Sequence, residues 1–383
     1  MGLGAASPGG PLGGLRVLEL AGIGPGPFAA MWLADLGADV LRLERGDPDA
    51  PAGEHWDLTA RSRPSVALDL KNPAGRDLVL ELSERADALI EGFRPGVAER
   101  LGVGPDEVLS RNPALVYARM TGYGQDGPWA QRAGHDINYI ALSGALWPLG
   151  RSGERPVPPL NLVGDFGGGA MYLVAGLLAA VLHARATGEG QVVDASMVDG
   201  SASLMTLTYA LRHAGVWRDE RGVNILDTGA PFYEVYETAD GGLLAVGAIE
   251  APFYRELVVG LGLDPEALPA QMDRASWPAL KRRFAELFAA RTTEEWLAHF
   301  ADRDACVSPV LSPAEAAEHP HNVARGTFVG PPLQPAPAPR FSATPARVGA
   351  APQPPGAGTR EGLRRWGIDE ERLAALREAG AFG

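Results

Sequence analysis

The stretch RVLELAGIGPGPFAAMWLADLGADVLRLE, residues 16–44, decides the fold. Apolar residues dominate positions 16–20 and 39–43, as expected for strands that are buried on both faces of a sheet. Between them, residues 22–27 form a Gly/Pro loop, and residues 28–36 predict an apolar helix that ends at Gly37. Strand, helix and strand make a βαβ unit, whose right-handed crossover places both strands parallel in one sheet.

Further elements of the same kind follow along the chain. The pattern predicts strands at residues 65–70, 88–90, 115–120 and 191–195, and helices at residues 73–86, 96–102, 106–111 and 170–186. Strands alternating with helices are typical of an α/β domain with a parallel sheet. We therefore predict an α/β large domain with a parallel sheet, in which residues 170–186 form a long buried helix.

The character of the chain changes near residue 200. Residues 1–200 form the first part of the large domain, residues 201–228 a linker that begins with a helix, and residues 229–325 a smaller α+β domain with a hairpin. The proline-rich residues 326–357 read as an extended return linker. Residues 358–383 predict a C-terminal helix that packs back on the large domain.

Composition excludes several classes of protein. A net charge of −13 over 383 residues argues against nucleic-acid binding, because no basic surplus neutralises phosphates. The longest apolar stretch is short for a bilayer span, and the first twelve residues do not resemble a secretion signal. The single cysteine, Cys306, excludes an intrachain disulfide and has apolar neighbours that favour burial. We expect a cytoplasmic enzyme that does not associate with a membrane.

Three polar residues are candidates for acid–base chemistry. His135 directly precedes Asp136, and Asp165 begins a run of glycines. A histidine and a carboxylate whose pKa values can approach neutrality suit proton transfer. On pattern alone, however, the His-Asp pair is more often a capped turn, and Asp165 is more often a helix N-cap. Glu250 follows an apolar strand and could orient His135 if the two side chains meet.

Ligand-binding patterns leave alternatives open. The loop at residues 22–27, with Glu44 after the next strand, weakly resembles a dinucleotide-binding motif, but Pro25 and Pro27 remove two backbone donors. Arginines cluster near strand ends, which suits a phosphate-rich ligand, although ordinary surface ion pairs explain them equally well. They are Arg45, Arg61, Arg63 and Arg94. No cysteine or carboxylate completes a metal site around the histidines, so no metal is predicted.

Taken together, these segments resemble the family III CoA-transferase and racemase superfamily (CaiB/BaiF), and within it the α-methylacyl-CoA racemases. The resemblance extends from about residue 12 to the C-terminus. The motifs that carry it are AGIGPGP at residues 21–27, LGADV at 36–40, GFRPG at 92–96, GYGQDGP at 122–128, GHDINY at 134–139, GD at 164–165, GAPFY at 229–233 and GAIE at 247–250.

The resemblance implies a large Rossmann-like domain joined by two linkers to the small domain. It implies an interlocked homodimer in which each active site lies between the large domain of one subunit and the small domain of the other. Glu250 could then meet His135 across subunits. The partner molecule would be an acyl-CoA thioester, with no cofactor beyond the CoA that belongs to the substrate.

The resemblance also separates racemases from transferases. Family transferases use the aspartate that matches Asp165 as a nucleophile that forms acyl anhydrides. They have glutamine where this chain has Gly24, no histidine at the position of His135, and a glycine-rich loop near residues 248–250. This chain follows the racemase pattern at these positions. It departs from its relatives at Pro64, where a basic residue is usual, and this leaves the detail of phosphate binding open.

The expected reaction is the interconversion of (R)- and (S)-2-methylacyl-CoA through an enolate, a step in fatty acid metabolism. His135 and Asp165 would face opposite sides of the α-carbon, with Glu250 orienting His135 and the Asp136 backbone N–H stabilising the enolate oxygen. The alternatives are a family III CoA-transferase and a non-catalytic CoA-binding protein. The expected substrate contacts are Arg45, Arg94 and Arg61 to CoA phosphates, with Ile23, Tyr233 and Met197 completing the set.

Overall fold

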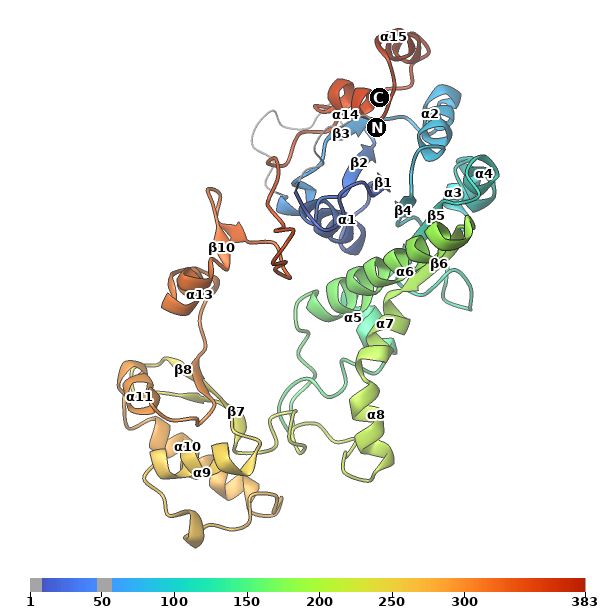
Figure 1. Cartoon of the computed structure of the whole chain (residues 1–383). Coiled ribbons are helices and arrows are strands. Elements are labelled where there is room, and N and C mark those ends of the chain that lie inside the picture. The colour runs from blue at the N-terminus through green and yellow to red at the C-terminus, as the bar shows by residue number, and fades with distance from the viewer. Residues whose placement is uncertain (1–8, 47–56, 383) are drawn as a thin grey trace. The chain divides into compact units, whose positions relative to one another are not determined.

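The computed structural model describes residues 9–46 and 57–382 of the chain. These residues form two compact units, both drawn in Figure 1. The first unit contains the described residues of the ranges 1–143, 160–204 and 329–383, and the second contains residues 144–159 and 205–328. The candidate acid–base residues His135 and Asp165 belong to the first unit, whereas Glu250 belongs to the second.

A parallel six-stranded sheet forms the centre of the first unit. Its spatial order is β3-β2-β1-β4-β5-β6, so the strand order reverses between β1 and β4. The strands are β1 (Arg16–Leu20), β2 (Asp39–Glu44), β3 (Ser65–Ala67), β4 (Ala88–Glu91), β5 (Val116–Thr121) and β6 (Gln191–Ser196). This order is that of a Rossmann-like sheet and confirms the predicted fold class. In such sheets ligands bind beyond the carboxyl ends of the strands at the reversal point.

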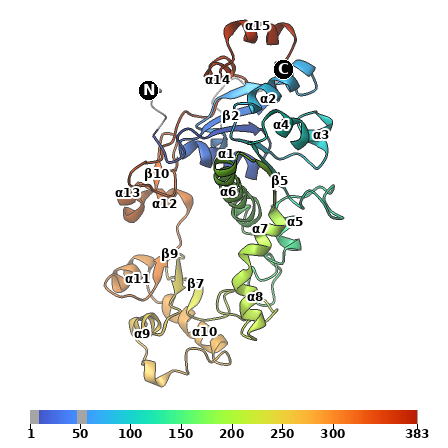
Figure 2. The same cartoon turned by 45° about the vertical axis from the view of Figure 1, so that its right-hand side comes forward.

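Helices cover both faces of this sheet. Alternate residues of each strand enter different cores, as Val17 and Leu18 show on β1. Helices α1 (Pro25–Asp35) and α6 (Met171–Thr187) pack on one face (Figure 2). The other face carries α2 (Pro73–Ser83), α3 (Val97–Arg100), α4 (Pro105–Arg111), α14 (Thr359–Arg365) and α15 (Glu370–Glu378). The near-continuous apolar strands therefore reflect burial on both sides.

The end of the chain completes the first unit. The Gly358 backbone N–H donates to the Ser65 carbonyl at 2.9 Å, and α14 lies beside β3 in Figures 1 and 2. Leu363, Trp366 and Leu376 are buried in the core beside residues of β1, β2 and β5. Residues separated by almost the whole chain length therefore form one hydrophobic core.

Helix α6 confirms the predicted long helix, which is buried along one side. Leu173, Leu177 and Val181 are buried in the core under the sheet. Among the described residues, the continuous helical stretch Leu162–Thr187 is long and apolar enough to cross a membrane by length and composition alone. Because the core helix of a soluble protein passes the same test, this stretch is weak evidence for a membrane span.

The second unit is built on an antiparallel sheet of β7 (Tyr233–Glu237), β8 (Leu243–Gly247) and β9 (Val307–Pro309). Phe232, Phe284 and Phe288 fill its core. Residues 144–159 pack with this unit, since Arg151 pairs with Glu234 at 2.9 Å. The sequence-based boundaries place these residues in the large domain. Helices of this unit are α8 (Thr206–His213), α9 (Ala251–Gly260), α10 (Trp277–Phe288), α11 (Thr293–Phe300), α12 (Pro313–Glu318) and α13 (Pro320–Arg325), with the short turn η3 (Pro265–Ala267).

Several local predictions need correction. Helix α1 begins at Pro25 rather than residue 28, because proline is well suited to the first helical position. The helix predicted from residue 201 is two helices, α7 (Met197–Leu204) and α8. Cys306 is exposed, not buried. The remaining elements are η1 (Leu58–Ala60), α5 (Asp136–Leu142), η2 (Leu162–Ala170), β10 (Phe328–Val329) and β11 (Gln334–Pro335).

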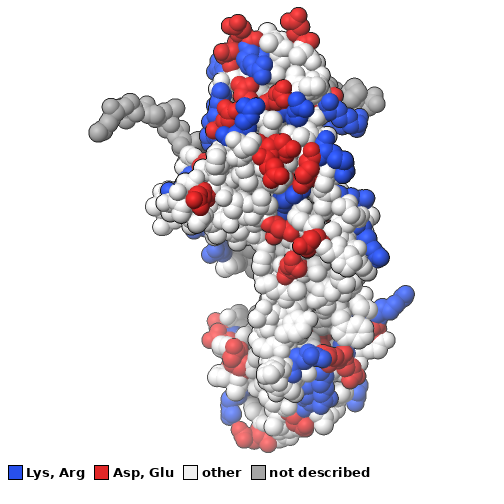
Figure 3. All heavy atoms as spheres, turned by 90° about the vertical axis from the view of Figure 1, so that its right-hand side faces the viewer, with Lys and Arg blue, Asp and Glu red and all other residues white. Residues whose placement is uncertain are grey.

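Charged side chains are mixed on the face of the molecule that Figure 3 shows. Acidic and basic side chains lie there in small separate groups among uncharged ones. This distribution accompanies a net charge of −13 for the whole sequence.

Candidate active site

A cavity of about 550 Å³ lies at the reversal point of the sheet. The loop after β1 and the loop after β4 form its two sides, as the strand order requires. It is lined by residues 22–27, 92–95, 120–123 and 132–135, together with Leu20, Ala130, Tyr139, Asn161, Asp165 and Met197. We call this the catalytic cavity, because it contains His135 and Asp165.

His135 stands at the entrance to α5. It has extended backbone angles as the N-cap residue, and its backbone N–H donates to the Asn138 Oδ1 at 3.0 Å. The loop after β5 and the start of α5 thus bring the imidazole into the catalytic cavity. Among the described residues, no group of three or more His, Cys, Asp and Glu side chains is arranged to hold a metal ion.

Asp165 lies within η2, which is a π-helix, and not at the N-cap that local propensity favours. Wider π-helical turns often occur at functional sites, because they displace one residue from the regular backbone pattern. Burial raises the pKa of the Asp165 carboxyl above its usual range. The hydrogen bond from Asn161 lowers this pKa, the charge of Asp136 raises it, and His135 lowers it. An aspartate with a raised pKa is suited to hold and donate a proton.

Asp136 is buried beneath these two residues. Its Oδ2 accepts the backbone N–H of Asp165 at 2.7 Å, so the side chain has a defined partner within the site. Stabilisation of the enolate oxygen by the Asp136 backbone N–H stays a prediction. That N–H lies in the first turn of α5, where backbone donors have no partner within the helix.

Two glycines permit close approaches at the site. Gly24 has φ of +70°, and a Cβ there would lie 3.0 Å from the Asp165 Oδ2. A Cβ on Gly122 would lie 2.0 Å from the ring of Tyr139. A longer side chain at position 24, such as the glutamine of family transferases, would therefore occupy the space beside the Asp165 carboxyl. The glycine leaves that space to a substrate.

Tyr139 forms an aromatic wall of the catalytic cavity. Its hydroxyl donates to the Gly134 carbonyl, and its ring packs edge-on against Tyr123 with centroids 4.9 Å apart. Burial raises the pKa of Tyr139 to about 12. The phenol therefore stays protonated at neutral pH, and it positions the loop before His135 instead of exchanging protons.

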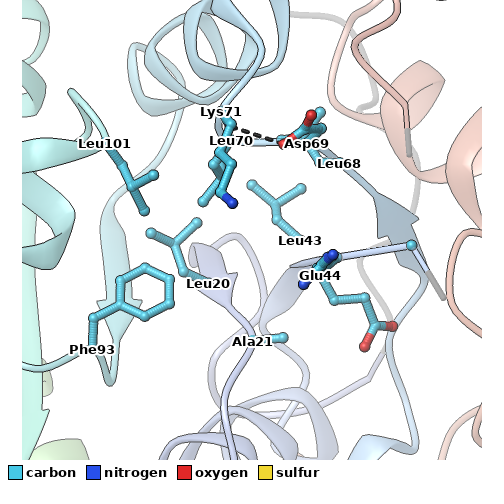
Figure 4. Close-up of a pocket in the computed structure, with 12 residues that line it drawn as sticks. Leu20, Ala21, Leu43, Glu44, Leu68, Asp69, Leu70, Lys71, Phe93 and Leu101 are labelled. Carbon is cyan, nitrogen blue, oxygen red and sulfur yellow. Dashed lines mark hydrogen bonds between the residues drawn. The ribbon is translucent and has the colours of Figure 1, made fainter.

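A second cavity of about 450 Å³ adjoins the first. We call it the strand-end cavity, because it lies beyond the ends of β1, β2 and β3. Figure 4 shows Leu20, Leu43 and Phe93 as apolar walls, with the ammonium group of Lys71 nearby. Arg45 also lines this cavity, whereas Arg94 lines the catalytic cavity. Leu20 and Phe93 line both cavities, so the two are neighbours.

Arg61 lines neither of these two cavities, and its predicted role as a phosphate ligand stays a prediction. Its side chain is buried, and its guanidinium pairs with Asp35 at 2.6 Å and donates to Gln334 at 2.7 Å. Arg63 is likewise buried and pairs with Glu19 at 2.6 Å. These arginines attach the segment before β3 to α1 and β1. They leave Arg45 and Arg94 as the predicted phosphate ligands that face a cavity.

Replacing Arg61 with leucine should therefore destabilise the protein. The change leaves the Asp35 carboxylate buried without its ion pair, which costs about 3–5 kcal/mol of unfolding free energy. Urea denaturation followed by circular dichroism measures the shift in midpoint. Arg76→Leu, which breaks the exposed pair with Asp77, is the control and should change the unfolding free energy by less than about 1 kcal/mol. A stable Arg61→Leu protein with weakened substrate binding would contradict a structural role for Arg61 and would support its predicted role as a phosphate ligand.

The remaining predicted residues fall into two groups. Ile23 is 82% exposed and lines the catalytic cavity, and Met197 lines it from the hydrophobic core. Glu250 is the N-cap residue of α9 and Tyr233 begins β7, so both belong to the second unit. Their contacts with the catalytic cavity stay predictions.

Sequence reasoning missed two residues that the structure brings into view. Asn161 lines the catalytic cavity and donates to the Asp165 Oδ2 at 3.1 Å. Lys71 lines the strand-end cavity. A signal for Lys71 existed, since it is one of two lysines in the chain and follows the third predicted strand. Nothing in the local pattern around Asn161 distinguishes it from a loop residue.

Residues 12–361 match the sequence pattern of CoA-transferase family III. The chain belongs to this family. Within the family, the chain is 48% identical to a mouse (Mus musculus) protein named alpha-methylacyl-CoA racemase, over 95% of this chain and 96% of the mouse protein. A human (Homo sapiens) protein of the same name is 45% identical over the same shares of the two chains.

The family III fold is also found by structural comparison. A crystal structure of a CaiB/BaiF family protein from Brucella suis superposes with a TM-score of 0.80, covering 94% of this chain and 100% of that one. The sequences are 24% identical, so this likeness concerns the fold. It agrees with the parallel sheet of the first unit, while family membership rests on the match over residues 12–361.

Proposed function

We propose that this family III protein is an α-methylacyl-CoA racemase, an isomerase that interconverts (R)- and (S)-2-methylacyl-CoA. The observation that carries the proposal is that His135 and Asp165 line one cavity, beside the space that Gly24 leaves open. The similarity to racemases of mouse and human supports it. The proposal extends to a cytoplasmic role in the metabolism of branched fatty acids.

The reaction requires one base and one acid on opposite sides of the α-carbon. With neutral His135 and protonated Asp165, the imidazole removes the α-proton and the electron pair moves into the thioester to form an enolate. Asp165 then gives its proton to the opposite face, which yields the other epimer. The reverse reaction starts from imidazolium and carboxylate. The raised pKa of Asp165 brings the two groups closer in basicity, which lets both forms be populated.

The CoA portion would occupy the strand-end cavity and the adjoining part of the catalytic cavity. Arg45 and Lys71 in the first, and Arg94 in the second, supply cations for phosphate groups. Leu20, Leu43 and Phe93 offer apolar surface for a base or for the pantetheine arm. Because Leu20 and Phe93 line both cavities, a CoA thioester can extend from one into the other.

The proposal includes an interlocked homodimer with Glu250 of one subunit near His135 of the other. It is supported by apolar surface on the first unit, where Leu182 is 70% exposed on α6 and Val192 on the edge strand β6 is 42% exposed. In the proposed dimer, the partner subunit would cover these exposed apolar side chains. No further cofactor is proposed, and neither nucleic acid nor a membrane is proposed as a partner.

Incubating a single epimer of a 2-methylacyl-CoA in deuterium oxide tests the proposal. Deuterium should enter the α-position and the opposite epimer should appear, with no acceptor acid present. Chiral chromatography and mass spectrometry follow both products. Transfer of CoA to an added carboxylic acid without α-exchange would instead assign the transferase activity of the family. Binding without either reaction would assign a non-catalytic CoA-binding protein.

A further inference from the structure

Two side chains of the first unit form hydrogen bonds with Asp165. Asn161 Nδ2 donates to the Asp165 Oδ2 at 3.1 Å, and the Asp136 Oδ2 accepts the Asp165 backbone N–H at 2.7 Å. We propose that the side chains of Asp136 and Asn161 are positioning residues that act through Asp165 in opposite senses. Asp136 favours the protonated form of Asp165, and Asn161 favours the ionised form. The inference rests on the proposed function.

The environment of Asp136 is hard to explain by stability alone. The residue is 6% exposed, and its Oδ1 has no hydrogen-bond partner among the described residues. A buried carboxylate with one satisfied oxygen carries a desolvation cost. Gly164 permits the close approach, because a Cβ there would lie 2.5 Å from the Asp136 Oδ2. The backbone of η2 is therefore shaped around this carboxylate.

Asp136 acts on Asp165 by two separable routes. The hydrogen bond to the backbone N–H fixes the turn of η2 that carries the Asp165 side chain. The negative charge opposes a second negative charge nearby and so raises the pKa of the Asp165 carboxyl. An asparagine at position 136 retains an acceptor oxygen and the backbone N–H while removing the charge.

Asn161 acts in the other direction. Its amide N–H is a better partner for an ionised carboxylate than for a neutral acid, so it lowers the pKa of Asp165. The amide also restricts rotation of the carboxyl, because it bonds one of the two oxygens. Removing the amide leaves burial and Asp136 to raise the pKa further.

The other ionisable groups around η2 have different surroundings. Among the described residues, Asp136 and His135 contribute the charges that bear on the pKa of Asp165, and Tyr139 stays neutral. The elements packed against η2 are α1, α5, α6, α7, β5 and β6. Their remaining ionisable groups are Asp35 on α1, which pairs with Arg61; Tyr172, His183 and Arg185 on α6; Asp199 on α7; Tyr117 and Arg119 on β5; and Asp194 on β6.

The kinetic consequence concerns the acid side of the pH profile. The active enzyme carries one proton on the pair His135 and Asp165, and the doubly protonated pair has no base. Activity therefore rises with pH as the more acidic member of the pair loses its proton. A lower pKa of Asp165 moves this rise to lower pH, and a higher pKa moves it to higher pH. Because the equilibrium constant between epimers is fixed, kcat/KM shifts alike for both epimers.

The test compares the pH dependence of kcat/KM for the wild type, Asp136→Asn and Asn161→Ala. We expect the acid limb to move to lower pH by about one unit in Asp136→Asn and to higher pH by up to about one unit in Asn161→Ala. Asp199→Asn, which removes an exposed charge on a helix that packs against η2, is the matched control and should not move the limb.

The outcomes separate this inference from the proposed function. Absence of α-exchange in the wild type would overturn the proposed function. The inference would be overturned if the wild type is an active racemase and the acid limb of the pH profile is unshifted in both variants. It would also be overturned if the acid limb moves in the same direction in both variants. A merely structural role predicts lower kcat without a shift of the limb. If Asp136→Asn fails to fold, the shift in Asn161→Ala alone decides, because Asn161 lies at the cavity surface.

Discussion

Replacing His135 with alanine should lower the rate of epimerisation by roughly 10²–10⁴-fold, the usual contribution of a general acid or base. The variant retains the shape of the cavity but lacks one of the two proton-transferring groups. Asp165 remains on its own side of the α-carbon. Any exchange that persists should therefore be confined to one epimer and should proceed with retention of configuration.

Deuterium incorporation into each epimer, measured separately, distinguishes these effects. His183→Ala is the control, because that histidine is exposed near the end of α6 and lies outside the catalytic cavity. It should retain wild-type exchange of both epimers. A His135→Ala enzyme that still epimerises at a near-normal rate would remove the imidazole from the mechanism.

Replacing Asp165 with alanine should produce the complementary defect, in which the other face of the substrate loses its proton-transferring group. Epimerisation should again fall by roughly 10²–10⁴-fold. The residual exchange should now be confined to the epimer that the His135→Ala enzyme cannot exchange. Two variants with complementary losses would be strong evidence that each residue serves one face of the substrate.

Asp165 also separates the racemase from the transferases of the family. A nucleophilic aspartate would form an acyl anhydride, which hydroxylamine traps and mass spectrometry detects as a modified residue. We expect no such modification in the wild type under conditions in which α-exchange is rapid. A trapped Asp165 adduct that forms at the rate of turnover would contradict proton transfer by this carboxyl.

The sheet was predictable because its physical signal is local. Alternate residues of each strand enter different cores, so residues such as Val40 and Leu41 are both apolar, and the βαβ handedness then constrains the topology. The π-helix at Asp165 was not predictable in this way. Its wider turn depends on packing, since Gly168 and Gly200 let η2 and α7 approach closely.

The candidate site likewise contains residues that were predictable from the sequence and residues that were not. His135, Asp165 and Arg94 follow predicted strands or glycine turns, and the structure places them in one cavity. Arg61 occupies a similar position in the sequence but turns toward Asp35, a partner that strand order alone does not reveal. Asn161 was missed because its role depends on the fold of η2. Residue type and spacing thus predict which element carries a residue, but not the direction of its side chain.

The order in which the ribosome makes the chain has a consequence for the first unit. Trp366, Leu373 and Leu376 complete the core that Leu18, Leu41 and Tyr117 begin. During synthesis, the strands leave the exit tunnel long before the helices that cover one of their faces. Helices α2, α3 and α4 already cover part of that face, so while the second unit emerges the sheet lacks only the cover that α14 and α15 supply. Until α14 and α15 arrive, the remaining apolar surface is of the kind that makes incompletely folded chains prone to aggregate.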